Sequence, residues 1–263
     1  MNTPTSTDSL ILERSGPVLV VTINRPKKRN ALDEGTVIGL ADLLTSLPED
    51  VRCVVLAATG EHFSAGIDLT ELVLRNAYDG MQHSRLWHKC LDAVQFGPVP
   101  VVAALHGAVI GGGLELAAAA HIRVADKTAF YALPEGARGM YVGGGGSARV
   151  PRLIGVARMA DMMLTGRVLN AEEGQQIGLS QYLVPDGAPF DKAMELAQKI
   201  AGNTTLTNFA LTQVLPRIAD SSQDIGLLTE SLIAALAQSD PEAKRRLGEF
   251  LDGRAARVSR SES

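Results

Sequence analysis

The 263-residue sequence has little cysteine, few aromatic residues and no excess of basic charge. Its two cysteines, Cys53 and Cys90, cannot form a disulfide framework, and they fit the reducing cytoplasm. Lysine and arginine number 25 against 29 aspartate and glutamate residues, so the net charge is −4. This balance excludes a strongly basic surface for the chain as a whole, and we expect no nucleic-acid partner.

Neither a targeting segment nor a membrane helix is expected. Residues 1–8 are polar and lack a basic start followed by an apolar run. The one stretch apolar enough to suggest a membrane helix, Val99 to Ala120, contains Glu115 and four glycines, which are unfavourable there. A buried strand, a glycine turn and a helix describe it better, so we expect a cytoplasmic protein without a membrane partner.

The first two thirds of the chain alternate between strand and helix signals. Short β-rich or buried runs predict strands, and apolar residues at helical spacing predict helices. The predicted strands are 18–23, 53–58, 101–105, 122–125 and 129–132, and the predicted helices are 33–47 and 112–120. This order favours an α/β architecture with buried parallel strand pairing.

The pattern changes to helices alone near the C-terminus. Helices are predicted over 190–201, 204–214, 224–237 and 240–251. Asn170 and Glu173 have the spacing of a capping box for an earlier helix. We therefore predict an α/β core over residues 1–195 and a C-terminal helical region over residues 196–263.

Three glycine-rich segments are candidates for chemistry: Phe63–Leu69, Gly107–Leu116 and Gly139–Arg149. No Walker A sequence is present, because no glycine is followed by Lys-Ser or Lys-Thr. Gly143, Gly145 and Ala148 match G-x-G-x-x-A, but the acidic residue of a Rossmann site does not follow. The five histidines have no zinc-site spacing, and the hydrolase motif G-x-S-x-G is missing.

Backbone donors beside carboxylates are the chemistry that remains. A glycine triplet that opens a helix exposes N–H groups, which can stabilise an oxyanion. Glu115 falls in the first turn of that helix, and Glu135 follows the strand at 129–132. Two such glutamates could act as general acid and base on a carbonyl compound. Both could equally be structural, because acidic residues are favoured in first helical turns and glycine clusters are often only tight turns.

Four longer motifs stand in order along the chain. They are N-R-P-x-x-x-N-A-L at 24–32, F-x-A-G-x-D-L at 63–69, G-x-x-x-G-G-G-x-E-L-A at 107–117, and P-E-x-x-x-G followed by G-x-G-G-x-x-R over 134–149. Together they resemble the enoyl-CoA hydratase/isomerase (crotonase) family over nearly the whole chain. The resemblance implies a crotonase-like spiral of ββα turns. It also implies a C-terminal α-helical region that builds a homotrimer or homohexamer and completes the CoA site.

The same resemblance implies roles for individual residues. The backbone N–H groups of Ile67 and Gly112 would form the oxyanion hole for the thioester carbonyl. Glu115 would help activate water for attack at the β-carbon, and Glu135 would supply a proton to the α-carbon. Gly143 would leave room for the water. The CoA thioester is then the substrate, and no metal or redox cofactor is required.

Further positions follow from the resemblance. The implied CoA-binding residues are Lys28, Arg29, Asn30, Ala31, Ser64, Ala65, Gly66 and Asp68. The implied neighbours of the water and acyl group are Tyr141, Val142 and Gly143. Val142 stands where the family often has proline, and Gly144 where it often has alanine. Within residues 70–90, three side chains could face an acyl chain or aryl ring, or belong to the core: Tyr78, Met81 and Trp87.

The implied activity is hydration of an enoyl-CoA thioester across its 2,3 double bond. A hydratase–lyase acting on an aryl- or heteroatom-substituted enoyl-CoA, an enoyl-CoA isomerase and a thioester hydrolase are the alternatives, together with a non-catalytic RNA-binding or scaffold protein. One C-terminal position departs from the family: Gly253 replaces a lysine that would approach a neighbour's CoA phosphates. Arg254 or Lys244 could compensate for it.

Overall fold

The computed structural model describes residues 7–71 and 73–254. Contacts divide the chain into two compact units, of which the first ends at Gly202 and the second begins at Asn203. The first unit holds every strand of the described residues, and the second holds helices. The boundary predicted between residues 195 and 196 lies inside helix α7 (Pro189–Ala201), which belongs to the first unit.

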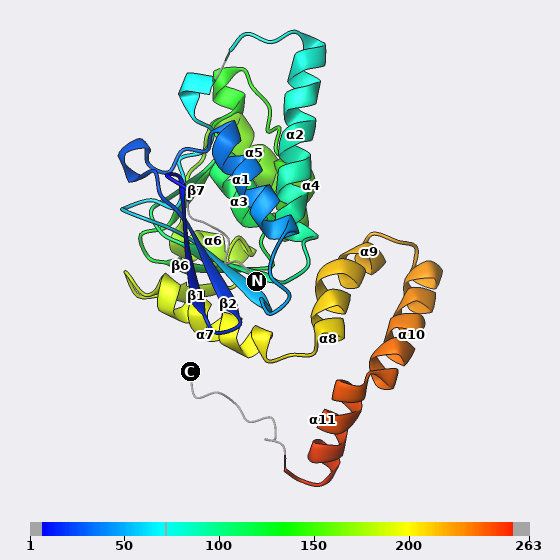
Figure 1. The fold of residues 1–263 in the computed structure, drawn as a ribbon. Helices are drawn as coiled ribbons and strands as arrows, with labels where there is room; N and C mark the ends of the chain where they lie inside the picture. Colours follow the sequence, from blue (N-terminus) through cyan, green and yellow to red (C-terminus); the bar gives the residue numbers. More distant parts are fainter. Residues whose placement is uncertain (1–6, 72, 255–263) are drawn as a thin grey trace. The chain divides into compact units, whose positions relative to one another are not determined.

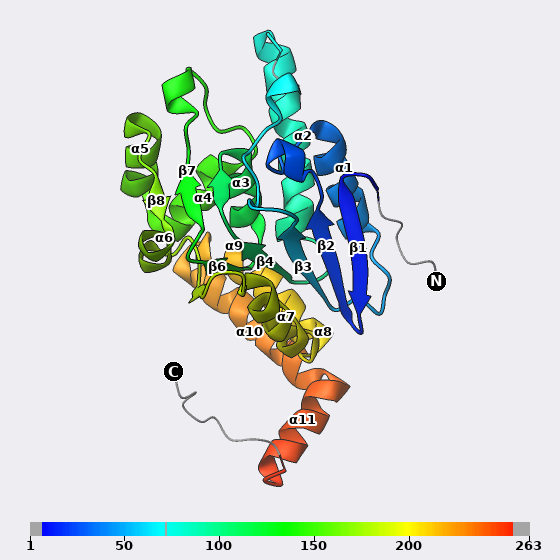
Figure 2. The same cartoon turned by 90° about the vertical axis from the view of Figure 1, so that its left-hand side faces the viewer.

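A six-stranded sheet forms the centre of the first unit (Figure 2). Its strands, in spatial order, are β1 (Leu10–Ser15), β2 (Val18–Ile23), β3 (Cys53–Ala58), β4 (Val101–Leu105), β6 (Ile122–Asp126) and β9 (Tyr182–Val184). Only the β1–β2 pair is antiparallel. The register runs straight across the middle, since Val20 pairs with Val55 and Val55 pairs with Val102.

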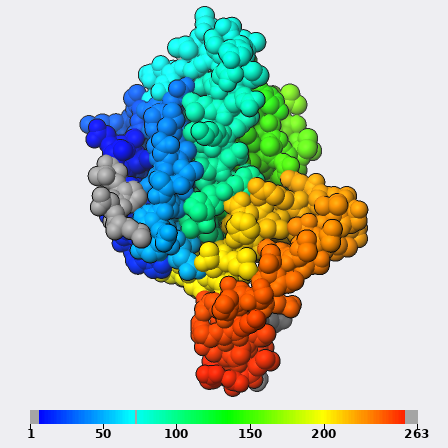
Figure 3. Space-filling model, turned by 45° about the vertical axis from the view of Figure 1, so that its right-hand side comes forward, coloured from blue at the N-terminus to red at the C-terminus, as the bar shows by residue number. Residues whose placement is uncertain are grey.

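Helices cover both faces of this sheet, because side chains alternate along each strand and both faces are apolar. Leu19 belongs to a hydrophobic cluster that includes residues of α1 (Glu34–Thr45), α2 (Ala77–Gln95) and α3 (Gly112–Ala119). Val20 belongs to a second cluster, which includes residues of α7. Figure 1 shows α7 beside the strands of this sheet. On the outside, α1 and α2 lie side by side (Figure 3).

A second, three-stranded sheet brings two of the glycine-rich segments together. It consists of β5 (Ala108–Ile110), β7 (Phe130–Ala132) and β8 (Leu169–Asn170). β5 runs parallel to β7, and an isolated parallel bridge joins Ser64 to Val109 of β5. The segment at 63–69 is therefore held against the strand that leads directly into α3.

The other elements are short. In the first unit they are the 3₁₀ turns Pro26–Lys28, Leu69–Glu71 and Gly136–Arg138, and the helices α4 (Gly146–Ile154), α5 (Val156–Thr165) and α6 (Ala171–Ile177). In the second unit they are α8 (Thr205–Phe209), the π-helical turn Ala210–Val214, α9 (Leu215–Ala219), α10 (Gln223–Ser239) and α11 (Pro241–Leu251). No helix in the described part of the chain is long and apolar enough to cross a membrane.

The predicted strands and core helices are confirmed to within a few residues. Helix α2 was not predicted. Its buried residues all lie in its C-terminal half, from Trp87 to Val94, so its first half lacks an apolar pattern at helical spacing. The helix predicted over 204–214 is wrong in detail: α8 ends at Phe209 and a π-helical turn replaces the rest. The capping box at Asn170 and Glu173 is confirmed at the start of α6.

Candidate active site

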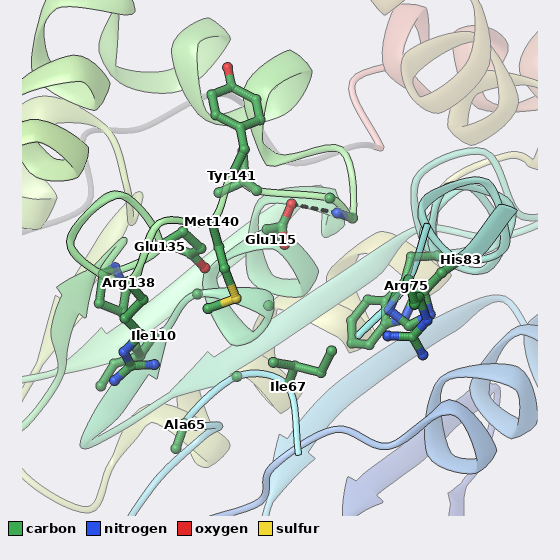
Figure 4. A pocket seen from close by; sticks show the side chains of 18 residues that line it. Ala65, Ile67, Arg75, His83, Ile110, Glu115, Glu135, Arg138, Met140 and Tyr141 are labelled. Atoms are coloured by element: carbon green, nitrogen blue, oxygen red, sulfur yellow. Dashed lines mark hydrogen bonds between the residues drawn. The ribbon is translucent and has the colours of Figure 1, made fainter. Parts of the chain in front are cut away.

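A cavity of about 330 Å³ opens where the three glycine-rich segments meet (Figure 4). It is lined by Ala65, Gly66, Ile67, Arg75, His83, Trp87, Ile110, Gly111, Gly112, Glu115, Pro134, Glu135, Arg138, Met140, Tyr141, Val142, Gly143 and Gly144. Both predicted glutamates are among these residues, as are the two predicted backbone donors. The cavity lies wholly within the first unit.

Glu115 is a buried carboxyl, only 4% exposed, on the first turn of α3. Its Oε1 accepts hydrogen bonds from the backbone N–H groups of Gly144, at 2.8 Å, and Gly146, at 2.7 Å. Burial raises the pKa of Glu115; these N–H groups oppose the shift, and the nearby charge of Glu135 adds to it. Among the described residues its second oxygen, Oε2, accepts no such bond, and a buried acid with a free oxygen is suited to proton transfer in the cavity.

Glycines make this approach possible. A Cβ at position 146 would lie 2.8 Å from Cγ of Glu115, and a Cβ at position 144 would lie 3.2 Å from its Cδ. Gly144, which stands where the family often has alanine, therefore gives the carboxyl more room. The G-x-G-x-x-A pattern at 143–148 therefore does not indicate a nucleotide site. The glycines of this loop allow the backbone to approach the carboxyl of Glu115.

Glu135 enters the cavity just after β7, which ends at Ala132. Its Oε2 is buried and has no hydrogen-bond partner among the described residues. Burial raises the pKa of Glu135, and its own backbone N–H and the charge of Arg138 oppose that shift. Gly111, at φ +52°, lets this side chain come close, because a Cβ there would lie 2.6 Å from its Oε1. Figure 4 shows the two carboxyl groups on one side of the cavity.

Two backbone N–H groups face the same cavity. Leu32 donates to the carbonyl of Gly66 and accepts from the N–H of Asp68, which turns the Ile67 N–H the other way. A Cβ on Gly112 would lie 3.5 Å from the Ile67 nitrogen, so the two amides are neighbours. Neither N–H has a hydrogen-bond partner in the described part of the chain. Gly112 is also the first residue of α3, where helices leave N–H groups free.

The residues predicted to bind CoA divide into two groups. Ala65 and Gly66 line the cavity, and Arg29 is exposed on the preceding turn. Asn30, by contrast, is fully buried: its side chain donates to the carbonyls of Thr59 and His62. It fixes the shape of the turn rather than offering a polar group to a ligand.

The buried carboxylate of Asp68 ties this turn to the cavity wall. Its Oδ2 lies 2.8 Å from Arg25 and 2.9 Å from Lys28. Lys28, with help from Thr70 and Arg25, holds the pKa of Asp68 well below its usual range. Ser64 is also buried, and its hydroxyl accepts from the N–H of Gly66. Asp68 and Ser64, which were predicted to bind CoA, therefore position the segment that carries Ile67.

Helix α2 holds the glycine loop from behind. Arg149, only 8% exposed, bonds to Asp92 at 2.5 Å and to Gln95 at 2.6 Å, both on α2. It also donates to the carbonyl of Gly144 at 2.9 Å, and Ser84 of α2 donates to the carbonyl of Gly143 at 2.6 Å. The peptide between Gly143 and Gly144 donates its N–H to Glu115, and Ser84 holds the carbonyl of this same peptide. Arg149 holds the carbonyl of the following peptide.

Several cavity residues were not predicted from the sequence: Arg75, His83, Ile110, Arg138 and Met140. Of the three aromatic and methionine candidates in 70–90, Trp87 both lines the cavity and is buried. Tyr78 and Met81 are exposed and do not line it. The four-residue spacing of His83 and Trp87 could have indicated that both side chains lie on one face of a helix. That interpretation requires knowing that α2 is a helix.

The sequence pattern of the enoyl-CoA hydratase/isomerase family matches residues 13–255. The chain belongs to this family. It is 32% identical over 250 residues to the short-chain-enoyl-CoA hydratase of Clostridium acetobutylicum, covering 94% of this chain and 96% of that protein. It is 30% identical over 249 residues to the 2,3-dehydroadipyl-CoA hydratase of Escherichia coli, covering 93% and 96%.

Solved structures of the family agree with the fold. A protein from Rhodopseudomonas palustris is 57% identical with a TM-score of 0.92, covering 97% of this chain and 100% of that one. The enoyl-CoA hydratase of Bacillus anthracis is 28% identical with a TM-score of 0.87, covering 95% and 98%. The predicted crotonase-like α/β fold with a helical C-terminal region is confirmed.

Proposed function

We propose that this family member is an enoyl-CoA hydratase, which adds water across the 2,3 double bond of an enoyl-CoA thioester. The observation that carries the proposal is the placement of the buried Glu115 and the half-buried Glu135 beside two backbone N–H groups that have no partner among the described residues. The relatives named as hydratases support the same activity. An isomerase is disfavoured because both acids are present.

In the proposed mechanism, the thioester carbonyl accepts hydrogen bonds from the N–H groups of Ile67 and Gly112. These donors stabilise the enolate as charge develops on its oxygen, and one such donor is typically worth about 3 kcal/mol of barrier. No side chain has to move to form this oxyanion hole, since the backbone of 66–68 and the start of α3 already hold both amides.

The two glutamates divide the proton transfers. Oε1 of Glu115 is occupied by two backbone N–H groups, so its Oε2 is the oxygen that takes a proton from water attacking the β-carbon. Glu135 then delivers a proton to the α-carbon. Because the charge of Glu135 raises the pKa of Glu115, we expect the titration of the two carboxyls to be coupled. Gly143 leaves space for the water beside them.

The wider proposal concerns CoA and assembly. The turn at 28–31 and the segment at 64–68 would bind the CoA moiety, and the C-terminal helices would assemble a homotrimer or homohexamer. Arg254 or Lys244 would approach a neighbour's CoA phosphates in place of a lysine at Gly253. The reaction would proceed without a metal or redox cofactor. Two free, buried cysteines favour a cytoplasmic location.

Loss of the ultraviolet absorbance of the conjugated enoyl thioester tests the proposal. Purified protein is mixed with crotonyl-CoA or cinnamoyl-CoA, with a thiol reagent present to detect free CoA. Loss of absorbance without thiol release supports a hydratase. Activity on the aryl ester alone would indicate a hydratase–lyase, and thiol release would indicate a hydrolase. Absence of any reaction would contradict the proposal.

Variants of the acid pair identify the catalytic groups. Glu115→Gln and Glu135→Gln should each lower kcat by at least about 100-fold, because each removes a proton-transfer group. KM for the CoA ester should change little. Glu172→Gln, an exposed glutamate of α6, is the matched control and should keep full activity. Near-normal turnover by either catalytic variant would refute the two-acid mechanism.

A further inference from the structure

A histidine–carboxylate pair lines the cavity away from the two catalytic glutamates. His83 of α2 and Arg75, which precedes that helix, lie together on one wall (Figure 4). Nδ1 of His83 lies 2.9 Å from Oε1 of Glu34, the first residue of α1. The proposed mechanism leaves this pair unused.

Three contacts fix the orientation of the pair. The backbone N–H of Glu34 donates to the carboxylate of Glu71 at 2.8 Å, and Arg75 lies 3.6 Å from the carboxylate of Glu34. The His83 side chain is only 18% exposed, and its ring packs edge-on against Trp87 with centroids 6.2 Å apart. A ring held on both sides presents one defined edge to the cavity.

The contact with Glu34 decides which hydrogen-bonding group that edge offers. A carboxylate accepts, so Nδ1 of His83 carries the proton and donates it. In the neutral ring Nε2 is then an acceptor. No partner for Nε2 occurs within the part of the chain that the structure describes. In this neutral form, the wall offers a lone pair to whatever occupies the cavity.

The wall formed by His83 and Arg75 would contact the acyl group of the substrate rather than its reacting carbons. A Cβ on Gly112 would lie 3.4 Å from the indole ring of Trp87, so Trp87 is next to the proposed oxyanion hole. His83 lies one helical turn before Trp87, nearer the start of α2, with its ring edge-on to the indole. Both side chains line the cavity, so an acyl chain that passes Trp87 would reach His83 with its far end.

We infer that the cavity selects enoyl-CoA esters whose acyl group carries a hydroxyl, and that His83, oriented by Glu34, accepts a hydrogen bond from it. The inference rests on the proposed hydratase function and adds a substrate class to it. A site built to accept from a hydroxyl discriminates strongly against an analogue that lacks one, because its own polar atom then stays unpaired.

Matched pairs of substrates test the inference. The hydroxyl esters are 4-hydroxybut-2-enoyl-CoA, 5-hydroxypent-2-enoyl-CoA and 6-hydroxyhex-2-enoyl-CoA, and each is compared with the alkyl ester in which a methyl group replaces the hydroxyl. For at least one length, the wild type should favour the hydroxyl ester by about tenfold or more in kcat/KM. The series of lengths finds the distance from the thioester to His83.

Variants link the preference to His83. His83→Leu should reduce the ratio to about one while hydration of the alkyl ester continues, and Glu34→Leu should reduce it in part. Gln82→Leu, an exposed neighbour on α2 that does not line the cavity, is the control and should keep the wild-type ratio. A merely structural ion pair between α1 and α2 would lower the melting temperature of His83→Leu and leave the ratio unchanged.

The outcomes separate the two proposals. Hydration of every ester with no preference for the hydroxyl would overturn the inference and leave the hydratase function intact. A preference for esters that end in a carboxylate would also overturn it, and would assign the wall to Arg75 instead. A ratio that His83→Leu does not change would overturn the role of His83. Failure to hydrate any ester would overturn the proposed function, and this inference with it.

Discussion

At the scale of single residues, the two catalytic candidates are carboxyls held where a charge is unfavourable. Burial is the largest cause of the raised pKa of both Glu115 and Glu135. A folded protein keeps such a pair because function needs it, since a carboxyl in an apolar surrounding can hold a proton near neutral pH and release it. The cost of that burial should be visible in stability.

Glu115→Gln should therefore be more stable than the wild type at pH 8. The pKa of Glu115 is higher in the folded than in the unfolded state, so its contribution to stability is greatest at low pH. That contribution declines as the pH rises from the unfolded to the folded pKa. Glutamine cannot ionise, and its Oε1 can accept the same two N–H groups. Thermal unfolding of both proteins at pH 5 and pH 8 measures the effect. A melting temperature of Glu115→Gln at or below the wild-type value at pH 8 would contradict this account.

Single residues were also where the sequence was most informative. The motif match placed Ile67, Gly112, Glu115 and Glu135, and the structure brings all four to one cavity. The same match could not distinguish a residue that lines the cavity from one that supports it. Asn30 is an example, because only the structure shows that its side chain hydrogen-bonds to backbone groups and is not available to a ligand.

At the scale of elements, α2 and α4 together control the loop that carries Gly144. Arg149→Met should lower kcat by about tenfold or more with little change in KM, since it frees the carbonyl of Gly144, the residue whose N–H bonds Glu115. The charge of Arg149 lowers the pKa of Glu115, against the effects of burial and of Glu135. The acid limb of the kcat/KM profile should therefore move to higher pH in this variant.

Two further variants show whether Arg149 acts through Glu115. Arg149→Lys keeps the charge and loses the forked contact, so it should restore the pH profile more than kcat. Arg152→Met changes an exposed arginine of the same helix and should behave like the wild type. A pH profile of Arg149→Met identical to that of the wild type would show that the arginine is structural only.

The capping box of α6 provides a second prediction at this scale. Asn170→Ala removes the acceptor of the Glu173 backbone N–H, a bond of 2.8 Å, and should lower the free energy of unfolding by about 1 kcal/mol. Urea denaturation measures the loss. The value of kcat should not change, because α6 does not line the cavity. A loss of activity in parallel would show that α6 is coupled to the site.

Elements also show where sequence patterns fail. The first half of α2 has no buried apolar residue to set a helical period, so only the N-cap Asn76, with Asp79 in the first turn, marks the start of the helix in the sequence. The strands were easier to predict, since they are short apolar runs buried on both faces. The π-helical turn at 210–214 depends on local backbone geometry that no apolar spacing reports.

At the scale of the whole molecule, the second unit exposes many large apolar side chains. They include Phe209, Leu211, Leu215, Ile225, Leu227, Leu228, Leu232, Leu236, Leu247, Phe250 and Leu251. A stable protein rarely leaves such a surface to water, so association of chains is the expected remedy. Sedimentation equilibrium should therefore give three or six times the chain mass of 27.8 kDa. A particle of single-chain mass at micromolar concentration would contradict the proposed assembly.

The sequence by itself determined the fold class and the family, and it singled out the glutamate pair proposed as the acids, because these depend on local patterns: buried runs, glycine turns and motifs of fixed spacing. Only the tertiary structure decided how the site is built. His83 and Trp87 line the same cavity as Glu115 because α2 packs beside α1 and α3, across separations in the chain that no local pattern encodes. The hydrogen-bonding edge of His83 depends likewise on Glu34, 49 residues away.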